Sequence, residues 1–136
     1  RTGNGSALVL LDIDHFKKIN DTYGHTVGDE AIRAVSRTIK EHARDLDIPG
    51  RYGGEEFGII LTNTNGDGAC VFAERLRKTI ESSSIYAEGH EIQFTVSMGV
   101  SELNPELHDH RHWIEKADQG LYKSKEGGRN RVTLLP

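Results

Sequence analysis

The sequence has little that would place it outside the cell or in a membrane. Its single cysteine, Cys70, cannot form a disulfide within the chain, which favours a reducing compartment. No apolar run approaches the roughly eighteen residues of a membrane-spanning helix, and no signal peptide is visible. We therefore expect a cytoplasmic domain without membrane contact, while membrane anchoring of the full-length protein stays open. An initiator methionine is missing and residues 1–6 resemble a loop, so we expect a fragment of a longer protein.

The chain also lacks a net basic charge. Its formal charge at pH 7 is -4, whereas nucleic-acid-binding domains usually present a basic face, so we expect no nucleic-acid partner. This charge still allows a nucleotide held by metal ions and a few local cations. Hydrophobic residues make up 35% and charged residues 28% of the sequence, which indicates one globular domain over 1–136.

Short apolar or alternating segments predict the strands. An apolar run over 7–13 predicts a buried strand, and strict alternation over 92–100 predicts another. The glycine pair at 53–54 indicates a hairpin turn with 58–61 as the returning strand, and 131–135 is expected to close the sheet.

Four segments carry helical patterns. A short helix is expected near 15–20, and after a turn at 23–25 a longer one begins near Gly28. Apolar residues at helical spacing over 69–80 and 111–125 predict two more.

Strands and helices alternate, but hairpins are present as well. The dipeptide at 49–50, Pro-Gly, is expected to break the chain before the hairpin. The predicted fold is α/β in the broad sense (α+β). It has a single central mixed or antiparallel sheet of about five strands, with helices on both faces.

Carboxylates gather at two turns of this predicted fold. Asp12 and Asp14 end the first strand, and Glu55 and Glu56 lie in the hairpin. Mg²⁺ prefers carboxylates together with water and phosphate oxygens, and two such ions could bridge a triphosphate. Solvated acidic turns are the alternative, because acidic residues are common in turns.

The hairpin residues 53–57, Gly-Gly-Glu-Glu-Phe, resemble the signature of GGDEF domains in its Glu variant. Further blocks match the family's order over nearly the whole chain: 12–17, 20–21, 24–25, 28–29, 51–52, and Lys125 with 128–130. The resemblance implies a diguanylate cyclase on a palm-like nucleotidyl-cyclase fold. Such an enzyme condenses two GTP into cyclic di-GMP and two pyrophosphates.

By this resemblance, the acidic turns would hold two Mg²⁺ or Mn²⁺ ions in each active site. Asp12 and Glu55 would be metal ligands, with the Ile13 carbonyl and Glu56 completing the set. Glu55 is also the family's candidate base for the attacking 3′-hydroxyl. The glycines at 53–54 lack a Cβ and would let the backbone approach the α-phosphate.

The resemblance also places the base and phosphate contacts. Asn20 and Asp29 match the guanine readers, and an aspartate can accept from both N1–H and N2 of guanine, a pattern adenine lacks. Asp29 could equally be a helix-start residue. Phe16 and Lys17 would line the phosphate pocket, and His25 is assigned either to the substrate pocket or to a structural role.

Cations near the C-terminus would complete the site. Lys125 and Arg129 would bind the phosphates. The alternative is that these cations stabilise the C-terminal end of a helix by interacting with its dipole. Arg51 is left open between a transition-state stabiliser and a structural ion pair.

An Arg-x-x-Asp pair, Arg44 and Asp47, stands just before the signature and matches the family's inhibitory site for its product. Arginine can grip guanine O6 and N7 in a bidentate fork. Arg75 matches the position that completes this site from a second copy.

The histidines at 108, 110 and 112 suggest a metal site, but no cysteine or further ligand has zinc-like spacing, so a solvated loop is expected. Cys70 and Trp113 are expected to pack in the core.

The chain lacks the family's usual lead-in segment, which joins the cyclase to a sensory or regulatory domain. We expect such a domain on the N-terminal side of the full-length protein, and a transient homodimer. Two alternatives to an active cyclase stay open. One is a GGDEF-fold receptor that binds cyclic di-GMP or GTP without catalysis, and the other is a polymerase or adenylate-type cyclase from outside the family.

Overall fold

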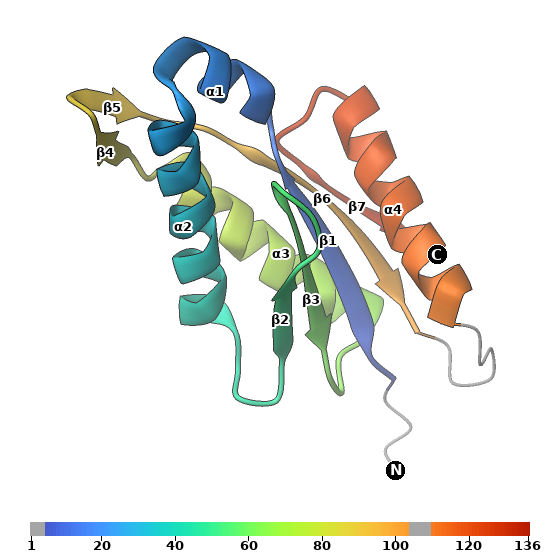
Figure 1. Cartoon of the computed structure of the whole chain (residues 1–136). Helices are drawn as coiled ribbons and strands as arrows, with labels where there is room; N and C mark the ends of the chain where they lie inside the picture. The colour runs from blue at the N-terminus through green and yellow to red at the C-terminus, as the bar shows by residue number, and fades with distance from the viewer. Residues whose placement is uncertain (1–4, 104–109) are drawn as a thin grey trace.

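The computed structural model describes residues 5–103 and 110–136 (Figure 1). In chain order the elements are β1 (Ala7–Ile13), α1 (Phe16–Tyr23), α2 (His25–His42), β2 (Ile48–Arg51), β3 (Glu56–Leu61), α3 (Gly66–Glu81), β4 (Ile85–Ala87), β5 (His90–Ile92), β6 (Val96–Glu102), α4 (His110–Glu126) and β7 (Val132–Leu135). Among the described residues, no helix has the length and apolar character to cross a membrane.

The central sheet has five strands in the order β2-β3-β1-β6-β7. β1 pairs antiparallel with both β3 and β6, and β7 joins β6 in parallel. β4 and β5 form a separate two-stranded hairpin. The predicted mixed sheet of about five strands is therefore confirmed.

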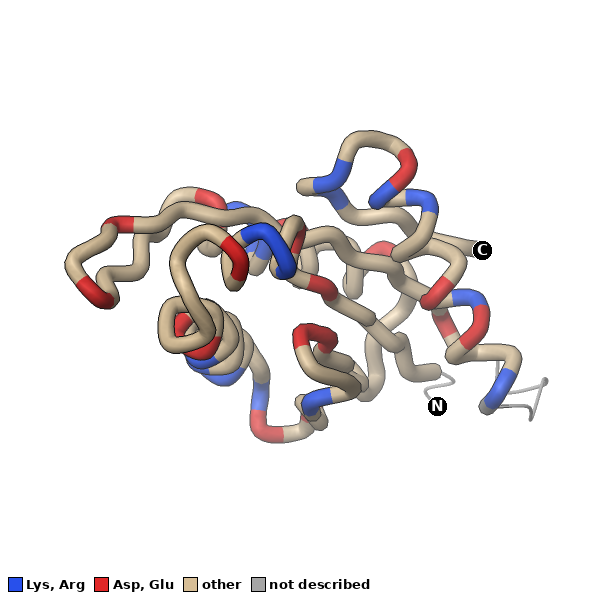
Figure 2. The backbone as a smooth tube through the Cα atoms, turned by 45° about the horizontal axis from the view of Figure 1, so that its top comes forward, with Lys and Arg blue, Asp and Glu red and all other residues tan. Residues whose placement is uncertain are grey.

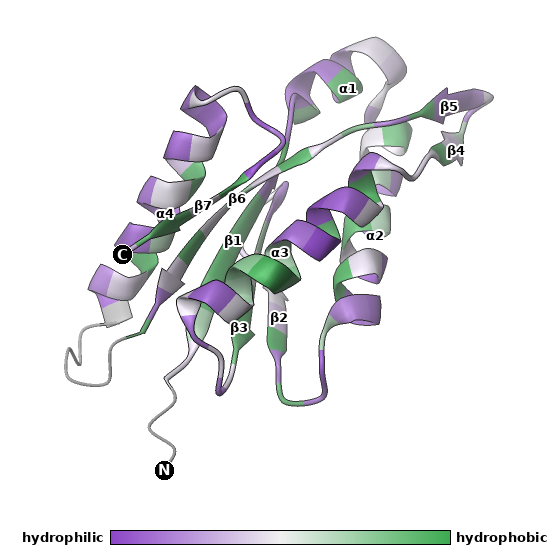
Figure 3. Ribbon diagram, turned by 180° about the vertical axis from the view of Figure 1, so that it is seen from behind, coloured by the Kyte–Doolittle hydropathy of each residue, from purple (hydrophilic) through white to green (hydrophobic). Residues whose placement is uncertain are grey.

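Helices cover both faces of the sheet, which explains why β1 is apolar from Ala7 to Leu11. Val9 and Leu11 face the core that α2 and α3 share, whereas Leu8 and Leu10 face α4 and its Trp113. A strand buried on both faces reads as a continuous apolar run rather than an alternating one. Figure 3 shows the largely hydrophobic ribbons of β1 and β3 behind α3.

α4 approaches the sheet closely where two glycines meet. A Cβ at Gly99 of β6 would overlap the Ala117 carbonyl oxygen and the Leu121 backbone nitrogen of α4. Gly120 lies on the α4 side of the same contact, where a Cβ would be 3.2 Å from the Gly99 Cα. This backbone contact holds the last turns of α4 against the sheet.

Two predicted boundaries were wrong. α2 begins at His25 rather than near Gly28, because Gly24, with φ of 95°, already separates it from α1. The dipeptide at 49–50 does not break the chain, because it lies within β2. β2 is an edge strand of the sheet, where a proline without an N–H is tolerated.

The alternating segment 92–100 also does not form one strand. β5 ends at Ile92 and β6 begins at Val96. The two halves pair with different partners, β4 and β1, so the chain leaves strand geometry between them. The alternation itself continues through the break, since Phe94 is buried.

Candidate active site at the end of β1

Two predicted metal ligands come together at the end of β1. The register of β1 and β3 places Asp12 opposite Glu56, next to Glu55 in the β2–β3 turn. The Ile13 N–H donates to the Glu55 carbonyl oxygen at 3.4 Å, which ties the turn to the strand. The acidic segments of β1 and of this hairpin lie close together in Figure 2.

The electrostatics of this pair favour a cation. Burial raises the pKa of the Glu55 carboxyl, and the neighbouring Asp12 carboxylate raises it further, while the Lys125 ammonium partly offsets both effects. Lys125 forms an ion pair with Asp12 Oδ2, but the buried Asp12 Oδ1 has no hydrogen-bond partner among the described residues. Two close carboxylates with one lysine and an unpartnered oxygen fit a divalent cation.

Glu56 does not join this pair. Its side chain lies over Gly53, where a Cβ would be 3.1 Å from Glu56 Oε1. The described residues contain no group of three or more His, Cys, Asp or Glu side chains arranged to hold a metal. Ile13 is buried in the core, so it can offer a metal only its carbonyl oxygen.

Arg51 stabilises the β2–β3 turn through hydrogen bonds to its backbone. Its Nη2 donates to the Gly54 carbonyl oxygen at 2.6 Å, and its Nε donates to that of Gly53 at 3.3 Å. These contacts favour a structural role for Arg51, through carbonyl groups rather than through an ion pair.

The second predicted group, the guanine readers, lies where α1 meets α2. Asn20 sits directly above Gly28, because a Cβ at Gly28 would overlap Asn20 Oδ1. That oxygen is buried and has no hydrogen-bond partner among the described residues. Asp29 follows Gly28 and is exposed, and a Cβ at Gly28 would also lie 3.4 Å from Phe16 Cζ. Asn20, Asp29 and Phe16 therefore lie around the same glycine.

The start of α1 offers open backbone donors. Its N-cap residue is His15, in the left-handed conformation with φ of 57°, and no side chain caps the helix. The first N–H groups of a helix have no partner within it, and such groups bind anions well. Lys17, in this first turn, is exposed and 3.4 Å from Asp21. His25 is exposed at the start of α2.

The two predicted cations differ in their contacts. Lys125 contacts Asp12, whereas Arg129 is exposed in the turn between α4 and β7. The Arg129 backbone has φ of 65°, and its N–H donates to the Ser124 carbonyl oxygen at 2.9 Å.

Sequence reasoning missed the role of Asp14. Its carboxylate is buried rather than presented at the tip, and it accepts hydrogen bonds from Thr95 at 2.6 Å and Ser97 at 2.6 Å. The Asn130 N–H donates to the same carboxylate at 3.0 Å. Asp14 thus holds the end of β1 in place and is not free to bind a ligand. A period-two pattern could not reveal this, because its partners come from remote segments.

Arg44 and Asp47 form an ion pair with each other. Arg44 Nη2 donates to Asp47 Oδ1 at 2.7 Å and to the Thr62 carbonyl oxygen at 2.8 Å, and Nε donates to Asp47 Oδ2 at 3.1 Å. Burial would raise the pKa of Asp47, but hydrogen bonds from Arg44 outweigh it and hold that pKa below its usual value. The pair lies beyond the Leu61 end of β3, with roughly 20 Å of strand between it and Glu55.

The remaining predicted residues fall outside this site. Arg75 is exposed on α3, with its guanidinium 5.9 Å above the Phe72 ring. Cys70 is half-buried and Trp113 is buried, which confirms packing roles. Of the three histidines, His112 is exposed on α4, while residue 108 and the side chain of residue 110 lie outside the described residues.

Comparison with known proteins supports the resemblance. The family model for "Diguanylate cyclase, GGDEF domain" matches residues 1–131. Diguanylate cyclase A of Treponema denticola is 48% identical over 128 residues, which are 94% of this chain and 34% of that protein. The probable diguanylate cyclase DgcC of Escherichia coli is 40% identical over 134 residues, 98% of this chain and 36% of that protein. The chain thus spans about a third of the length of these relatives.

Solved structures agree with the sequence comparison. The GGDEF domain of DgcB from Caulobacter crescentus, in complex with c-di-GMP, superposes with a TM-score of 0.92 at 38% identity, covering 98% of this chain and 79% of that one. The active GGEEF domain of a diguanylate cyclase from Vibrio cholerae gives 0.90 at 34% identity, covering 98% and 84%. Nothing in these likenesses favours a polymerase or adenylate-type cyclase. The chain belongs to the diguanylate cyclase GGDEF domain family.

Proposed function

We propose that this domain is an active diguanylate cyclase, which joins two GTP molecules into cyclic di-GMP. The observation that carries the proposal is the close pair Asp12 and Glu55, with a buried carboxylate oxygen that has no hydrogen-bond partner in the described part of the chain. A receptor without catalysis would have no need to keep two carboxylates together at such an electrostatic cost.

Guanine selectivity is assigned to Asn20 and Asp29. The buried Asn20 Oδ1 needs a donor, and guanine offers N–H groups on its Watson–Crick edge. Asp29 is adjacent and exposed, so its carboxylate is accessible to N1–H and N2. Adenine would leave these acceptors unpaired, which is the strongest kind of discrimination that a binding site offers.

The phosphates would lie between the start of α1 and the cations Lys125 and Arg129. The uncapped N–H groups after His15 supply donors, and Lys17 adds a positive charge beside them. Lys125, which holds Asp12 in the described structure, would exchange this partner for a phosphate oxygen.

The reaction needs a base and charge neutralisation. The 3′-hydroxyl oxygen of one GTP attacks the α-phosphorus of the other, the bond to pyrophosphate breaks, and Glu55 accepts the hydroxyl proton. Two Mg²⁺ or Mn²⁺ ions would be held by Asp12 and Glu55 with the Ile13 carbonyl, and by Glu56 once its side chain turns away from Gly53. These ions would supply positive charge for the phosphates.

A single site activates one phosphate, so two domains must meet face to face in a transient homodimer. The second bond then forms by the same steps with the two sites exchanged. Cyclic di-GMP would inhibit the enzyme at Arg44 and Asp47, with Arg75 from a second copy. The length of the relatives supports a further regulatory domain in the full protein.

Glu55→Gln tests the proposal, because it removes the base while keeping the shape of the side chain. Product formation from GTP with Mg²⁺ should fall to background, while the thermal unfolding midpoint should not fall, since a strained carboxylate pair is relieved. The control is Asp67→Gln, which changes an exposed carboxylate on α3 and should keep parental turnover. Parental turnover in Glu55→Gln would refute the role of Glu55.

A further inference from the structure

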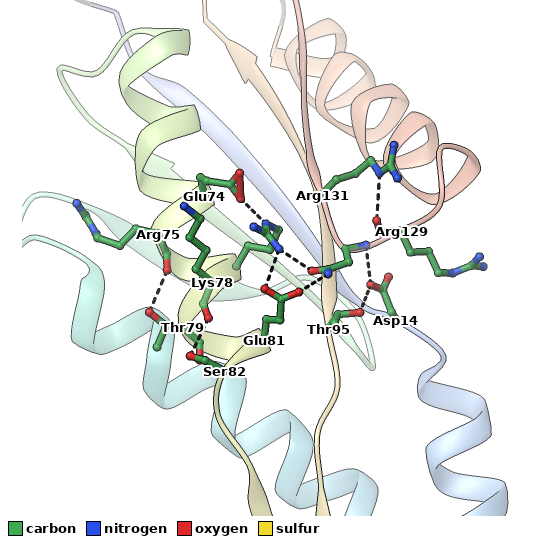
Figure 4. Close-up of polar contacts among 12 residues, drawn as sticks. Asp14, Glu74, Arg75, Lys78, Thr79, Glu81, Ser82, Thr95, Arg129 and Arg131 are labelled. Atoms are coloured by element: carbon green, nitrogen blue, oxygen red, sulfur yellow. Dashed lines mark hydrogen bonds and ion pairs between the residues drawn. The ribbon is translucent and has the colours of Figure 1, made fainter.

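Asn130 joins three elements around the candidate site. Its Oδ1 accepts from Arg77 Nη1 at 2.9 Å, and its Nδ2 donates to Glu81 Oε2 at 2.7 Å, both on α3. Its backbone N–H donates to Asp14 Oδ2 at 3.0 Å, at the end of β1. Figure 4 shows this network between α3, Asp14 and the turn that carries Arg129.

The α3 end of the network is firmly anchored. Arg77 is largely buried and also forms ion pairs with Glu74 and with Glu81, the latter at 3.4 Å. At the other end, Asp14 is fixed by Thr95. The position of Asn130 is therefore fixed by α3 on one side and by Asp14 on the other, and neither belongs to the α4–β7 turn.

The chemistry at this position suits asparagine. The amide uses its oxygen as an acceptor and its nitrogen as a donor, so both ends are satisfied. The backbone is left-handed at Arg129 (φ of 65°) and at Asn130 (φ of 49°), a conformation that asparagine tolerates better than most residues. An aspartate here would place a carboxylate against Glu81.

The direction of the Arg129 side chain depends on the conformation of this turn. Its backbone is held by the Ser124 carbonyl oxygen, and its own carbonyl oxygen accepts from Arg131 Nε at 3.1 Å. Its side chain makes no hydrogen bond or ion pair within 5–103 and 110–136, and it points away from the α3 network in Figure 4. Within the described ranges, only the turn itself therefore sets the direction of the guanidinium.

We infer that Asn130 is a positioning residue for nucleotide binding. It fixes the α4–β7 turn to α3 and to Asp14, and thereby orients the Arg129 side chain toward the phosphates. The inference rests on the proposed function, since it needs GTP as the ligand. Glu81, on α3, supports the same turn through Asn130 Nδ2 and so acts on the nucleotide without touching it.

Asn130→Gly is the most direct variant, because glycine accepts the left-handed backbone and removes only the two side-chain bonds. The affinity for a non-reacting GTP analogue, measured by calorimetry with Mg²⁺, should fall by about threefold to tenfold, the size expected when a supporting network is lost. Glu81→Ala should weaken binding in the same direction, and Glu81→Gln, which keeps an acceptor for Asn130 Nδ2, should restore most of it.

A double-mutant cycle separates positioning from general stability. If Asn130 acts through Arg129, then Asn130→Gly should change affinity by less than about twofold once Arg129 is alanine. If the two substitutions lower the affinity additively in the double variant, the inference is wrong. It is also wrong if Asn130→Gly alone leaves the affinity unchanged. Failure of the parental protein to bind the analogue would overturn the proposed function, and this inference with it.

Discussion

At the scale of single residues, Asp12 and Asn20 share one property. Each buries a side-chain oxygen without a hydrogen-bond partner among the described residues. Leaving a buried acceptor unpaired costs about 1–3 kcal/mol, so folded proteins keep such groups where a ligand supplies the partner. In the proposed function the two oxygens would mark the two ends of the nucleotide, with a cation for Asp12 and a base N–H for Asn20.

Asp29→Ala tests the base end. Affinity for GTP should fall by about tenfold, because the guanine N–H groups lose an acceptor, while affinity for ATP should barely change. Calorimetry with both nucleotides measures the difference. Glu41→Ala is a matched control, since Glu41 is an exposed carboxylate farther along the same helix, α2. Equal losses for GTP and ATP in Asp29→Ala would show a folding role at the start of α2 instead.

Asp47→Asn tests the Arg44 pair through its pH dependence. The folded-state pKa of Asp47 is held below its usual value of 3.8, so the unfolded state binds more protons as the solution becomes acidic. The Arg44–Asp47 pair therefore stabilises the folded state fully at neutral pH. This stabilisation begins to fall once the pH drops below the usual pKa of Asp47, and it is lost as the pH passes through the lower pKa of the folded state. At pH 7 the variant should lose about 1–2 kcal/mol, a range that allows for the half-exposed Arg44.

Urea unfolding of the parental protein and Asp47→Asn at several pH values gives this comparison. The gap between the two should narrow steadily below about pH 4. Asp45→Asn, two residues away and exposed, should show no such pH-dependent gap. A gap that stays constant down to acidic pH would contradict the assigned ion pair.

At the scale of elements, the contact between α4 and β6 places Lys125 beside Asp12. Gly99→Ala should separate the two elements, because the new Cβ would overlap the backbone of α4. We expect a loss of at least about 2 kcal/mol in the free energy of unfolding, since neither backbone can yield easily. Gly50→Ala is the control, because a Cβ there meets nothing within 4 Å. Equal stability of the two variants would contradict this packing.

The sequence predicted elements well where burial follows one periodicity. The apolar run of β1 and the apolar face of α3 gave the correct segments, because each packs against a continuous core. It failed where pairing partners decide the outcome. The break between β5 and β6, and the place of Pro49 in an edge strand, depend on which strands lie alongside.

The candidate site divides in the same way. The turn that carries Glu55 could be predicted from a local motif, and so could the Arg44–Asp47 pair, three residues apart. The contact of Asp14 with Asn130 spans 116 residues and has no local pattern. For this reason the sequence presented Asp14 as a free carboxylate, whereas the fold uses it to hold the site together.

At the scale of the whole molecule, the proposed reaction needs two copies of the candidate site. One domain supplies one set of Asp12, Glu55, Asn20 and Asp29, and therefore one activated phosphate. The attacking hydroxyl must arrive from a second domain in a two-fold arrangement. We therefore expect activity to depend on how often two domains meet, and regulation to act on that encounter.

The most direct test is to incubate the domain with GTP and Mg²⁺ over a roughly hundredfold range of protein concentration, and to identify the product by chromatography. The account predicts cyclic di-GMP and pyrophosphate, with activity per mole of protein that rises with concentration, and no product from Glu55→Gln. GTP that binds but yields no cyclic di-GMP at any concentration would contradict the account and leave a receptor instead of an enzyme.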